Sequence, residues 1–238
     1  MSFLATSGLC KYYGGLHAVH DVDFRLEEGE VRALIGPNGA GKTTFVGMLC
    51  GRVEATAGRV TFLDQDVTSL PAHKRIVLGM GYTFQITSIF SRLTLFENVA
   101  LAVRRRIEDR TKTAAEVGEA LAQVGLDDRT TQTAGDLSYG HQRLLEIAMG
   151  LGQKPRLLIL DEPTQGLADG EIVNFMQLLK AVSADTTILL IEHNMDVVME
   201  VADKITVMNN GEILAEGTPA LIRKNPAVQA AYLGIDDA

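Results

Sequence analysis

The sequence predicts an α/β fold in which a parallel sheet forms the core, with an antiparallel β subdomain at the N-terminus and an inserted helical subdomain. From Val31 onward, short apolar runs typical of buried parallel strands alternate with helical patterns. Earlier in the chain, residues 3–9 and 18–26 alternate in polarity around a Gly-Gly pair, which is typical of antiparallel strands. Within about 86–153 the strand pattern stops, which indicates a helical insertion in a single domain spanning 1–238.

The helices expected in the inserted segment begin at recognisable capping residues. Thr94 is followed three residues later by Glu97, a capping box that predicts a helix start. Residues 114–124 have the pattern of a second helix. Ser138 is a good N-cap for a third helix, which is apolar along one face.

Strands return after this segment, and short helices follow them. The later strands are expected at Leu157, Thr186, Ile205 and Glu212. Each of the pairs Thr218-Pro219 and Asn225-Pro226 places an N-cap before a proline at the first helical position. Two short helices are therefore predicted in the tail.

The composition is that expected of an intracellular catalytic subunit. With 238 residues, 46% of them hydrophobic, the chain can bury a full core. Two cysteines provide no disulfide framework, no apolar run approaches membrane-spanning length, and the N-terminus lacks a signal-peptide pattern. The formal net charge of −8 argues against a general nucleic-acid binder. We therefore expect no nucleic-acid partner, and any membrane association should come through another subunit.

A phosphate-binding loop is the strongest motif. The segment Gly36-Pro37-Asn38-Gly39-Ala40-Gly41-Lys42-Thr43 matches the pattern Gly-x-x-x-x-Gly-Lys-Thr and follows an apolar run. Its glycines let the backbone curl around one anion, while Thr43 and Thr44 open a helix whose positive end faces the same anion. Lys42 should reach the β- and γ-phosphates, and the Thr43 hydroxyl should bind Mg²⁺. A glycine-rich turn with an unrelated lysine is the alternative, but the strand and helix context favours ATP or GTP.

A pair of carboxylates indicates hydrolysis. Residues 157–160 form an apolar run that ends in Asp161 and Glu162, so the acidic pair should lie at the carboxyl end of a buried parallel strand. Ligands bind at that end of open α/β sheets. Asp161 can hold Mg²⁺ through water, and Glu162 can take a proton from the attacking water. Taken alone, this pattern also fits a solvated strand end, and the phosphate loop is what makes it informative.

The segment Leu137-Ser138-Tyr139-Gly140-His141-Gln142 resembles the signature of ABC-type ATPases, which is usually Leu-Ser-Gly-Gly-Gln. This chain departs from it at Tyr139 and His141 and keeps Ser138 and Gly140. The resemblance implies the P-loop NTPase fold of ABC ATPases, with ATP and Mg²⁺ as cofactors. It also implies that Ser138 and Gly140 of one subunit close over ATP bound to another subunit. Without the neighbouring motifs, the same segment would be read only as a well-capped helix.

The resemblance assigns three further positions. Gln85 matches the Q-loop glutamine that contacts Mg²⁺ and the hydrolytic water, and His193 matches the switch histidine that touches the γ-phosphate. Tyr13 stands where relatives place an aromatic ring against adenine. The D-loop matches least well, because many relatives have an aspartate where this chain has Ala168, with Asp169 following. A lone tyrosine or histidine is otherwise more often core or surface than ligand, so these assignments depend on the order of the motifs.

Within the family, the details resemble importers. Residues 191–195, 217–219 and 231–234 are similar to ATP-binding subunits of branched-chain amino-acid importers and of the related urea or amide importers. The resemblance implies a homodimer, or a heterodimer with a homologous ATPase, bound to integral-membrane permease subunits at the cytoplasmic face of the inner membrane. A periplasmic or extracellular solute-binding protein would be an indirect partner.

Other functions remain open at this level. The residues found in the signature segment and at Ala168-Asp169 slightly favour the urea-like branch of the family. A lipopolysaccharide-export ATPase would share the architecture and a similar tail. A soluble ABC ATPase that is not part of a transporter is a different class, but such relatives usually carry tandem domains, long insertions or basic arms.

The segment 86–98 is a candidate coupling surface. It follows Gln85 and contains apolar residues, including Phe90 and Phe96. In transporter relatives this region receives a short helix from the membrane subunit, and the resemblance implies the same docking here. The alternative is that Phe90 and Phe96 close the core of the helical subdomain, because aromatic side chains are usually buried.

Overall fold

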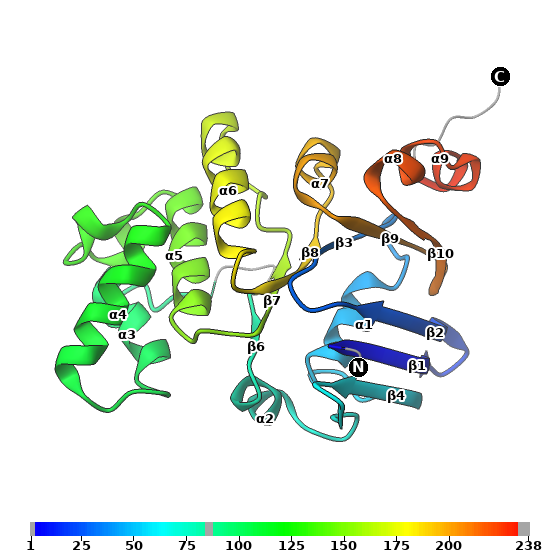
Figure 1. Cartoon of the computed structure of the whole chain (residues 1–238), viewed down its shortest axis with the longest axis horizontal. Helices are drawn as coiled ribbons and strands as arrows, with labels where there is room; N and C mark the ends of the chain where they lie inside the picture. The colour runs from blue at the N-terminus through cyan, green and yellow to red at the C-terminus, as the bar shows by residue number, and fades with distance from the viewer. Residues whose placement is uncertain (1–2, 84–87, 233–238) are drawn as a thin grey trace. The chain divides into compact units, whose positions relative to one another are not determined.

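The computed structural model describes residues 3–83 and 88–232. Contacts between residues divide the chain into two compact units (Figure 1). Unit 1 comprises Met1–Leu78 and Thr187–Ala238, and unit 2 is Gly79–Thr186. The fold is of the predicted α/β class, and three helices of unit 2 fall inside the segment where the sequence predicts a helical insertion.

Unit 1 contains the predicted antiparallel sheet, which has strand order β2-β1-β4-β5. The strands are β1 (Leu4–Tyr13), β2 (Leu16–Leu26), β4 (Ala57–Phe62) and β5 (Gln65–Asp66). Strands β4 and β5 were not expected here, because the sequence pattern from Val31 onward predicts a parallel sheet. A Cβ on Gly58 would lie 2.2 Å from the carbonyl oxygen of Gly8, so this pair of glycines permits the close approach of β4 to β1.

The second group of strands in unit 1 is centred on β3 (Val31–Ile35). Strand β3 pairs in parallel with β8 (Thr187–Ile191) on one side and with β9 (Lys204–Asn209) on the other. Strand β10 (Glu212–Gly217) pairs antiparallel with β9. Every residue of β3 and β8 is buried, which explains why both strands read as continuous apolar runs without alternation.

Some of the helices of unit 1 bury a common core with β3 and β9. The helices of this unit are α1 (Lys42–Leu49), α2 (Ala72–Val77), α7 (Met195–Val201), α8 (Pro219–Arg223) and α9 (Pro226–Tyr232). The predicted tail helices α8 and α9 are confirmed, and both lie beside β10 (Figure 1). Val198 of α7, Ile222 of α8 and Val228 of α9 join one buried cluster with residues of β3 and β9.

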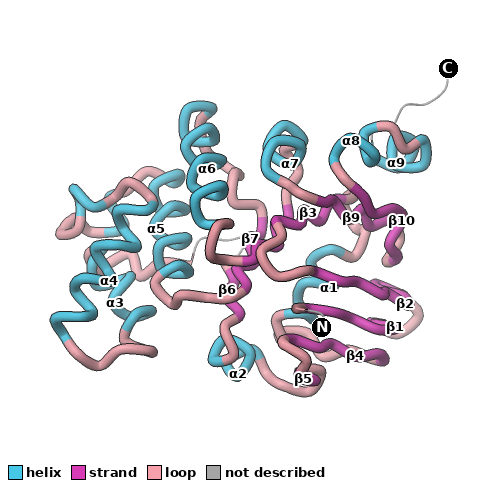
Figure 2. Tube along the Cα trace, in the orientation of Figure 1, coloured by secondary structure: helices cyan, strands magenta, loops and turns pink. Residues whose placement is uncertain are grey.

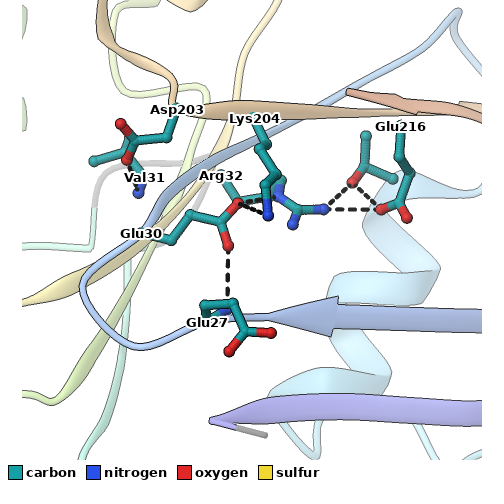
Figure 3. A network of polar contacts seen from close by, with 8 residues as sticks. Glu27, Glu30, Val31, Arg32, Asp203, Lys204 and Glu216 are labelled. Atoms are coloured by element: carbon teal, nitrogen blue, oxygen red, sulfur yellow. Dashed lines mark hydrogen bonds and ion pairs between the residues drawn. The ribbon is translucent and has the colours of Figure 1, made fainter. Parts of the chain in front are cut away.

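A buried ion-pair network connects β3, β9 and β10 (Figure 3). Arg32, the second residue of β3, is 3% exposed. Its guanidinium donates to Glu30 Oε1 at 2.7 Å, to Glu216 Oε1 at 2.8 Å and to Thr206 Oγ1 at 2.9 Å. Lys204 Nζ lies 3.9 Å from Glu30. This buried charge is therefore paired on both sides, as burial of an ion requires.

In the part of unit 2 that the structure describes, a pair of parallel strands is combined with four α-helices (Figure 2). Strand β6 (Met80–Tyr82) pairs with β7 (Leu157–Asp161). The helices are α3 (Leu95–Val103), α4 (Arg110–Gln123), α5 (Tyr139–Leu151) and α6 (Asp169–Val182). Helices α3, α4 and α5 pack against one another, and short 3₁₀ turns at Asp127–Arg129 and Ala134–Asp136 lead into α5.

The polar contacts of unit 2 fix where its helices begin and meet. The predicted capping box is confirmed: the N–H of Glu97 donates to Thr94 Oγ1, and the N–H of Thr94 donates to the Glu97 carboxylate. Glu116 of α4 pairs with Arg106 and with Lys154, which lies beyond the end of α5. The hydrogen bond from Arg106, and secondly that from Lys154, lowers the pKa of the Glu116 carboxyl against the opposing effect of burial.

Two further observations bear on the sequence-based expectations. Cys10 and Cys50 are both buried, at 7% and 6% exposure. Within residues 3–83 and 88–232, no helix is long and apolar enough to cross a membrane.

Candidate active site

The phosphate loop lies between β3 and α1, as the sequence predicts. Gly36 has φ +150°, and a Cβ there would lie 2.2 Å from the carbonyl oxygen of Met208. Gly41 has φ +97°, and its Cβ would lie 2.3 Å from the carbonyl oxygen of Ala18. Glycine is therefore required at both ends of the loop for two reasons, backbone conformation and lack of space.

Lys42 lies along the inside of this loop. Its side chain is 7% exposed, and Nζ donates to the carbonyl oxygens of Gly36 at 2.6 Å and Pro37 at 3.0 Å. The N-cap of α1 is Gly41, which makes no side-chain capping bond. The first N–H groups of α1 are thus presented beside a lysine ammonium, an arrangement suited to a polyphosphate.

The remaining loop residues differ in exposure. Asn38, Gly39 and Thr43 are exposed, Pro37 and Thr44 are half-buried, and Ala40 is buried. The exposed Thr43 hydroxyl is available to a metal ion bound at the phosphates. The loop thus has the backbone, charge and hydroxyl that the motif requires.

Tyr13 and His193 belong to the same unit as the loop. Tyr13 ends β1, is 49% exposed, and has Lys11 Nζ 5.1 Å from its ring centroid. His193 is exposed and follows β8, the parallel neighbour of β3. Because β3 leads into the phosphate loop, His193 and the loop emerge at the same edge of the sheet.

The turn that carries His193 is built by two polar neighbours. Glu192 is buried, and its Oε2 accepts the backbone N–H of His193 at 2.6 Å and that of Asn194 at 3.0 Å. The Asn194 side chain in turn caps α7. Gln85, which the sequence predicts as a catalytic residue together with Lys42, Glu162 and His193, lies outside the described residues.

Asp161 ends β7 in unit 2 and is held from two sides. Its side chain is 3% exposed, and the Tyr82 hydroxyl donates to Oδ2 at 2.8 Å. The guanidinium of Arg143, from α5, donates to the Asp161 carbonyl oxygen and pairs with Glu146 at 2.6 Å. The carboxylate at the strand end is therefore fixed by the neighbouring strand, and its backbone is fixed by the signature helix.

Glu162 follows with a strained backbone. Its φ is +49°, in the left-handed region that non-glycine residues rarely adopt, and its side chain is half-buried. Such a conformation costs on the order of 1–3 kcal/mol and persists only where the surrounding structure imposes it. The left-handed backbone at Glu162 interrupts the extended conformation of β7, which ends at Asp161.

The signature segment begins α5, and the predicted N-cap is confirmed. Ser138 Oγ accepts the backbone N–H of His141 at 3.3 Å and lies 2.7 Å from His141 Nδ1. Gly140 is buried, and a Cβ there would lie 2.7 Å and 2.9 Å from the carboxylate oxygens of Glu171. Ser138 itself is exposed, so its hydroxyl is accessible at the start of the helix.

The two departures from the usual signature both contact the segment that follows β7. A Cβ on Gly166 would lie 2.5 Å from the Tyr139 ring, so this ring packs directly against Gly166. His141 Nδ1 lies 4.0 Å from Glu171 Oε1, on α6. Ala168, the residue in doubt in the D-loop, is the N-cap of α6, and its N–H donates to Glu171 Oε2 at 2.8 Å.

The candidate residues thus fall into two groups. Unit 1 carries the loop, Lys42, Tyr13 and His193, and unit 2 carries Asp161, Glu162, Ser138 and Gly140. Sequence reasoning missed Tyr82, Arg143 and Glu171, which support the second group. Tyr82 could have been found by predicting that β6 pairs with β7, because this pairing brings Tyr82 beside the strand that ends in Asp161. No local sequence pattern marks Glu171.

Comparison with known proteins now decides the family. A family described as "ABC transporter" matches residues 19–165, which include the phosphate loop and the carboxylate pair. The chain belongs to the ABC transporter family. A second family, described as "Branched-chain amino acid ATP-binding cassette transporter", matches residues 212–238 of this ABC ATPase.

Curated relatives of this ABC ATPase match it over nearly its whole length. The high-affinity branched-chain amino acid transport ATP-binding protein BraF of Pseudomonas aeruginosa is 39% identical over 97% of each chain. The corresponding protein LivG of Escherichia coli is 37% identical over 97% of each chain. A probable LivG of Archaeoglobus fulgidus is 34% identical and covers 100% of this chain and 98% of that protein.

Solved structures give the same fold. An ATP-binding cassette of an ABC transporter in its ADP conformation superposes with a TM-score of 0.88 at 29% identity, over 98% of this chain and 99% of that one. A nucleotide-free ATP-binding cassette gives 0.87 at the same identity and coverage. The predicted ABC-ATPase fold is therefore confirmed, and with it the class of enzyme, an ATPase.

Proposed function

We propose that this ABC ATPase is the subunit that powers an importer for branched-chain amino acids or a related small polar solute. The observation that carries the proposal is similarity over 97% of the chain to proteins named for branched-chain amino acid transport. The match of residues 212–238 to the corresponding transporter family supports the same solute class.

The chemistry proposed for the site is ATP hydrolysis assisted by Mg²⁺. The backbone of the phosphate loop and Lys42 hold the β- and γ-phosphates, and Tyr13 lies against adenine. Thr43, Gln85 and Asp161 would hold the metal ion, and the buried, hydrogen-bonded carboxylate of Asp161 fits a hard cation. Bound Mg²⁺ neutralises negative charge on the phosphate oxygens.

The chain's own residues then move the proton. Glu162 accepts a proton from the attacking water. His193 contacts the γ-phosphate. Ser138 and Gly140 close over the nucleotide of the other subunit, which is a second copy or a homologous ATPase.

The proposed assembly places this subunit at the cytoplasmic face of the cell membrane, bound to permease subunits that receive solute from a binding protein. The exposed surface at Phe90 supports this docking, because the ring is 54% exposed whereas Phe96 is half-buried. Asn98 is buried and bonds both the N–H and the carbonyl oxygen of Phe90, at 2.8 Å and 3.1 Å. These two bonds fix the backbone of Phe90, and its exposed ring is available to a partner.

Substitution of Glu162 tests the proposed chemistry. Glu162→Gln should bind ATP like the parent but lower steady-state hydrolysis roughly 10²-fold or more, because an amide cannot accept the water proton. Lys42→Ala should weaken nucleotide binding as well as hydrolysis, since the phosphates lose the ammonium of the loop. Nucleotide affinity and turnover should be measured for both variants.

Glu119→Gln is the matched control, because Glu119 is exposed on α4 and should leave both quantities unchanged. Turnover of Glu162→Gln near that of the parent would remove Glu162 from the role of base. Reconstitution with the cognate permease then tests the solute: uptake of leucine that depends on Lys42 supports the proposal, and uptake of urea or an amide alone would contradict it.

A further inference from the structure

The Ser138 hydroxyl is shared between the helix it caps and the imidazole of His141. Its oxygen accepts the backbone N–H of His141 at 3.3 Å, and the same oxygen lies 2.7 Å from Nδ1 of that ring. A hydroxyl has one hydrogen and two lone pairs, whereas an imidazole nitrogen is either a donor or an acceptor. The position of a single proton therefore decides which of the two groups donates.

The two arrangements differ in what they leave for a ligand. If Nδ1 carries no proton, the Ser138 hydrogen is donated to the ring and is not available to an anion. If Nδ1 carries a proton, the ring donates to Oγ, and the hydroxyl hydrogen can be donated to a phosphate oxygen. Because hydrogen bonds to charged acceptors are the stronger ones, the second arrangement is the one that binds a nucleotide well.

Glu171 is the charged group that faces this ring. Its Oε1 lies 4.0 Å from His141 Nδ1, with the side chains 29% and 30% exposed. The carboxylate is held by the Ala168 N–H at 2.8 Å and lies against Gly140, where a Cβ would overlap it. A negative charge at this position attracts a proton to the nearer nitrogen.

Among the described residues, the pocket beside this ring has no other charged side chain on its wall. His141 and Glu171 line a pocket of about 420 Å³ between α4, α5 and α6. The other polar side chains on its wall, Gln123 of α4 and Asn174 and Gln177 of α6, are neutral. Of the side chains on this wall, Glu171 is therefore the charged one that can bias which nitrogen of the ring carries the proton.

We propose that His141 is a positioning residue for the signature serine: Glu171 keeps a proton on His141 Nδ1, which donates to Ser138 Oγ and leaves the Ser138 hydrogen for the nucleotide of the other subunit. This inference rests on the proposed function, because it requires ATP clamped between two subunits. It gives a role to His141, which stands where the usual signature has its glutamine.

The first test determines, in the isolated protein, which ring nitrogen of His141 carries the proton. Nitrogen-15 NMR of labelled His141 should show Nδ1 protonated at pH 8 in the parent, and Glu171→Gln should shift the proton to Nε2. Glutamine keeps an oxygen for the Ala168 N–H, so the start of α6 is preserved. An unprotonated Nδ1 in the parent at pH 8 would overturn the inference.

The second test measures ATP-dependent pairing in the Glu162→Gln background by sedimentation. At pH 8, Glu171→Gln should weaken pairing about tenfold, the effect expected for loss of a hydrogen bond to a charged group. Acidification favours the imidazolium, which carries protons on both nitrogens, so pairing of Glu171→Gln should increase from pH 8 to pH 6. A purely structural role for Glu171 would give the same defect at both pH values and would overturn the inference.

His141→Ala is the matched control. Without the ring, Ser138 has no competing acceptor, so adding Glu171→Gln should have no further effect on pairing at either pH. A tenfold loss in that background would show that Glu171 acts without His141, against the inference. If no variant pairs with ATP at any pH, two copies of this chain do not close over ATP and the proposed pairing of identical chains is in error, whereas the NMR result still decides the direction of the hydrogen bond.

Discussion

At the scale of single residues, the phosphate loop contains two glycines in similar conformations and different surroundings. Gly39 has φ +81° and open space around the position of a Cβ, whereas Gly41 has φ +97° and would overlap the carbonyl of Ala18. Gly39→Ala should therefore lose about 1–2 kcal/mol of unfolding free energy, from the left-handed backbone alone. Gly41→Ala should lose about 1–3 kcal/mol more, from overlap with backbone that cannot move aside.

Urea unfolding without nucleotide separates this effect from ligand binding. Gly39→Ala serves as the control for backbone strain, because both glycines have positive φ. Equal losses for the two variants would mean that the contact with Ala18 does not constrain the loop.

The sequence could predict which residues form the candidate site better than it could predict the contacts that hold them in place. The phosphate loop and the Ser138 cap are local patterns, so their geometry follows from neighbours in the chain. The strained backbone of Glu162 is imposed by surrounding structure, and no residue type at that position signals it. The contact of Glu171 with Gly140 joins residues 31 positions apart, which no local pattern contains.

At the scale of elements, the Arg32 network should stabilise unit 1 through its most buried pair. Arg32→Met leaves Glu30, whose side chain is 7% exposed, without its guanidinium partner. The expected loss is up to about 3–5 kcal/mol of unfolding free energy, because the buried Glu30 charge keeps only the longer contact with Lys204 Nζ at 3.9 Å. Urea unfolding of the full chain measures this loss.

Two further variants test whether the buried charge of Glu30 causes this loss of stability. Glu216→Ala should cost about 1 kcal/mol or less, because that side chain is 39% exposed. Adding Glu30→Gln to Arg32→Met should recover part of the lost stability, since the buried charge is removed. A double variant less stable than Arg32→Met would contradict this account.

Helices were predictable where the residues at their first turn mark the helix start. The capping box at Thr94 and the Asn-Pro and Thr-Pro pairs of the tail each act within three or four residues, and all three helices are present. Strands β4 and β5 joined the antiparallel sheet against expectation, because the approach of Gly58 to Gly8 depends on residues 50 positions apart. Sheet partners of this kind are not contained in local periodicity.

At the scale of the whole molecule, the proposed pair of subunits makes each nucleotide site from two chains. A Lys42→Ala chain has a defective phosphate loop and an intact signature, and a Ser138→Arg chain has the reverse. Either variant alone should be nearly inactive. A mixture should regain ATPase activity, because the mixed pair contains one site built from both intact parts.

The measurement is the ATPase rate of the mixture against the summed rates of the separate variants at the same total concentration. Mixing two preparations that each carry Lys42→Ala controls for concentration and should give no gain. A mixture no more active than the sum would count against a site shared between two copies of this chain.

The burial of both native thiols has a practical consequence for following this pairing. Cys10 lies within β1, where its sulfur accepts the Asp21 N–H at 3.2 Å, and Cys50 caps the end of α1. Maleimide reagents need an accessible thiolate, so both native cysteines should label slowly. A single cysteine introduced at the exposed Glu119 would then accept a fluorophore selectively in an otherwise unaltered chain. Energy transfer between two such labelled copies could report association and separation in real time, without the need to remove any native side chain from the core.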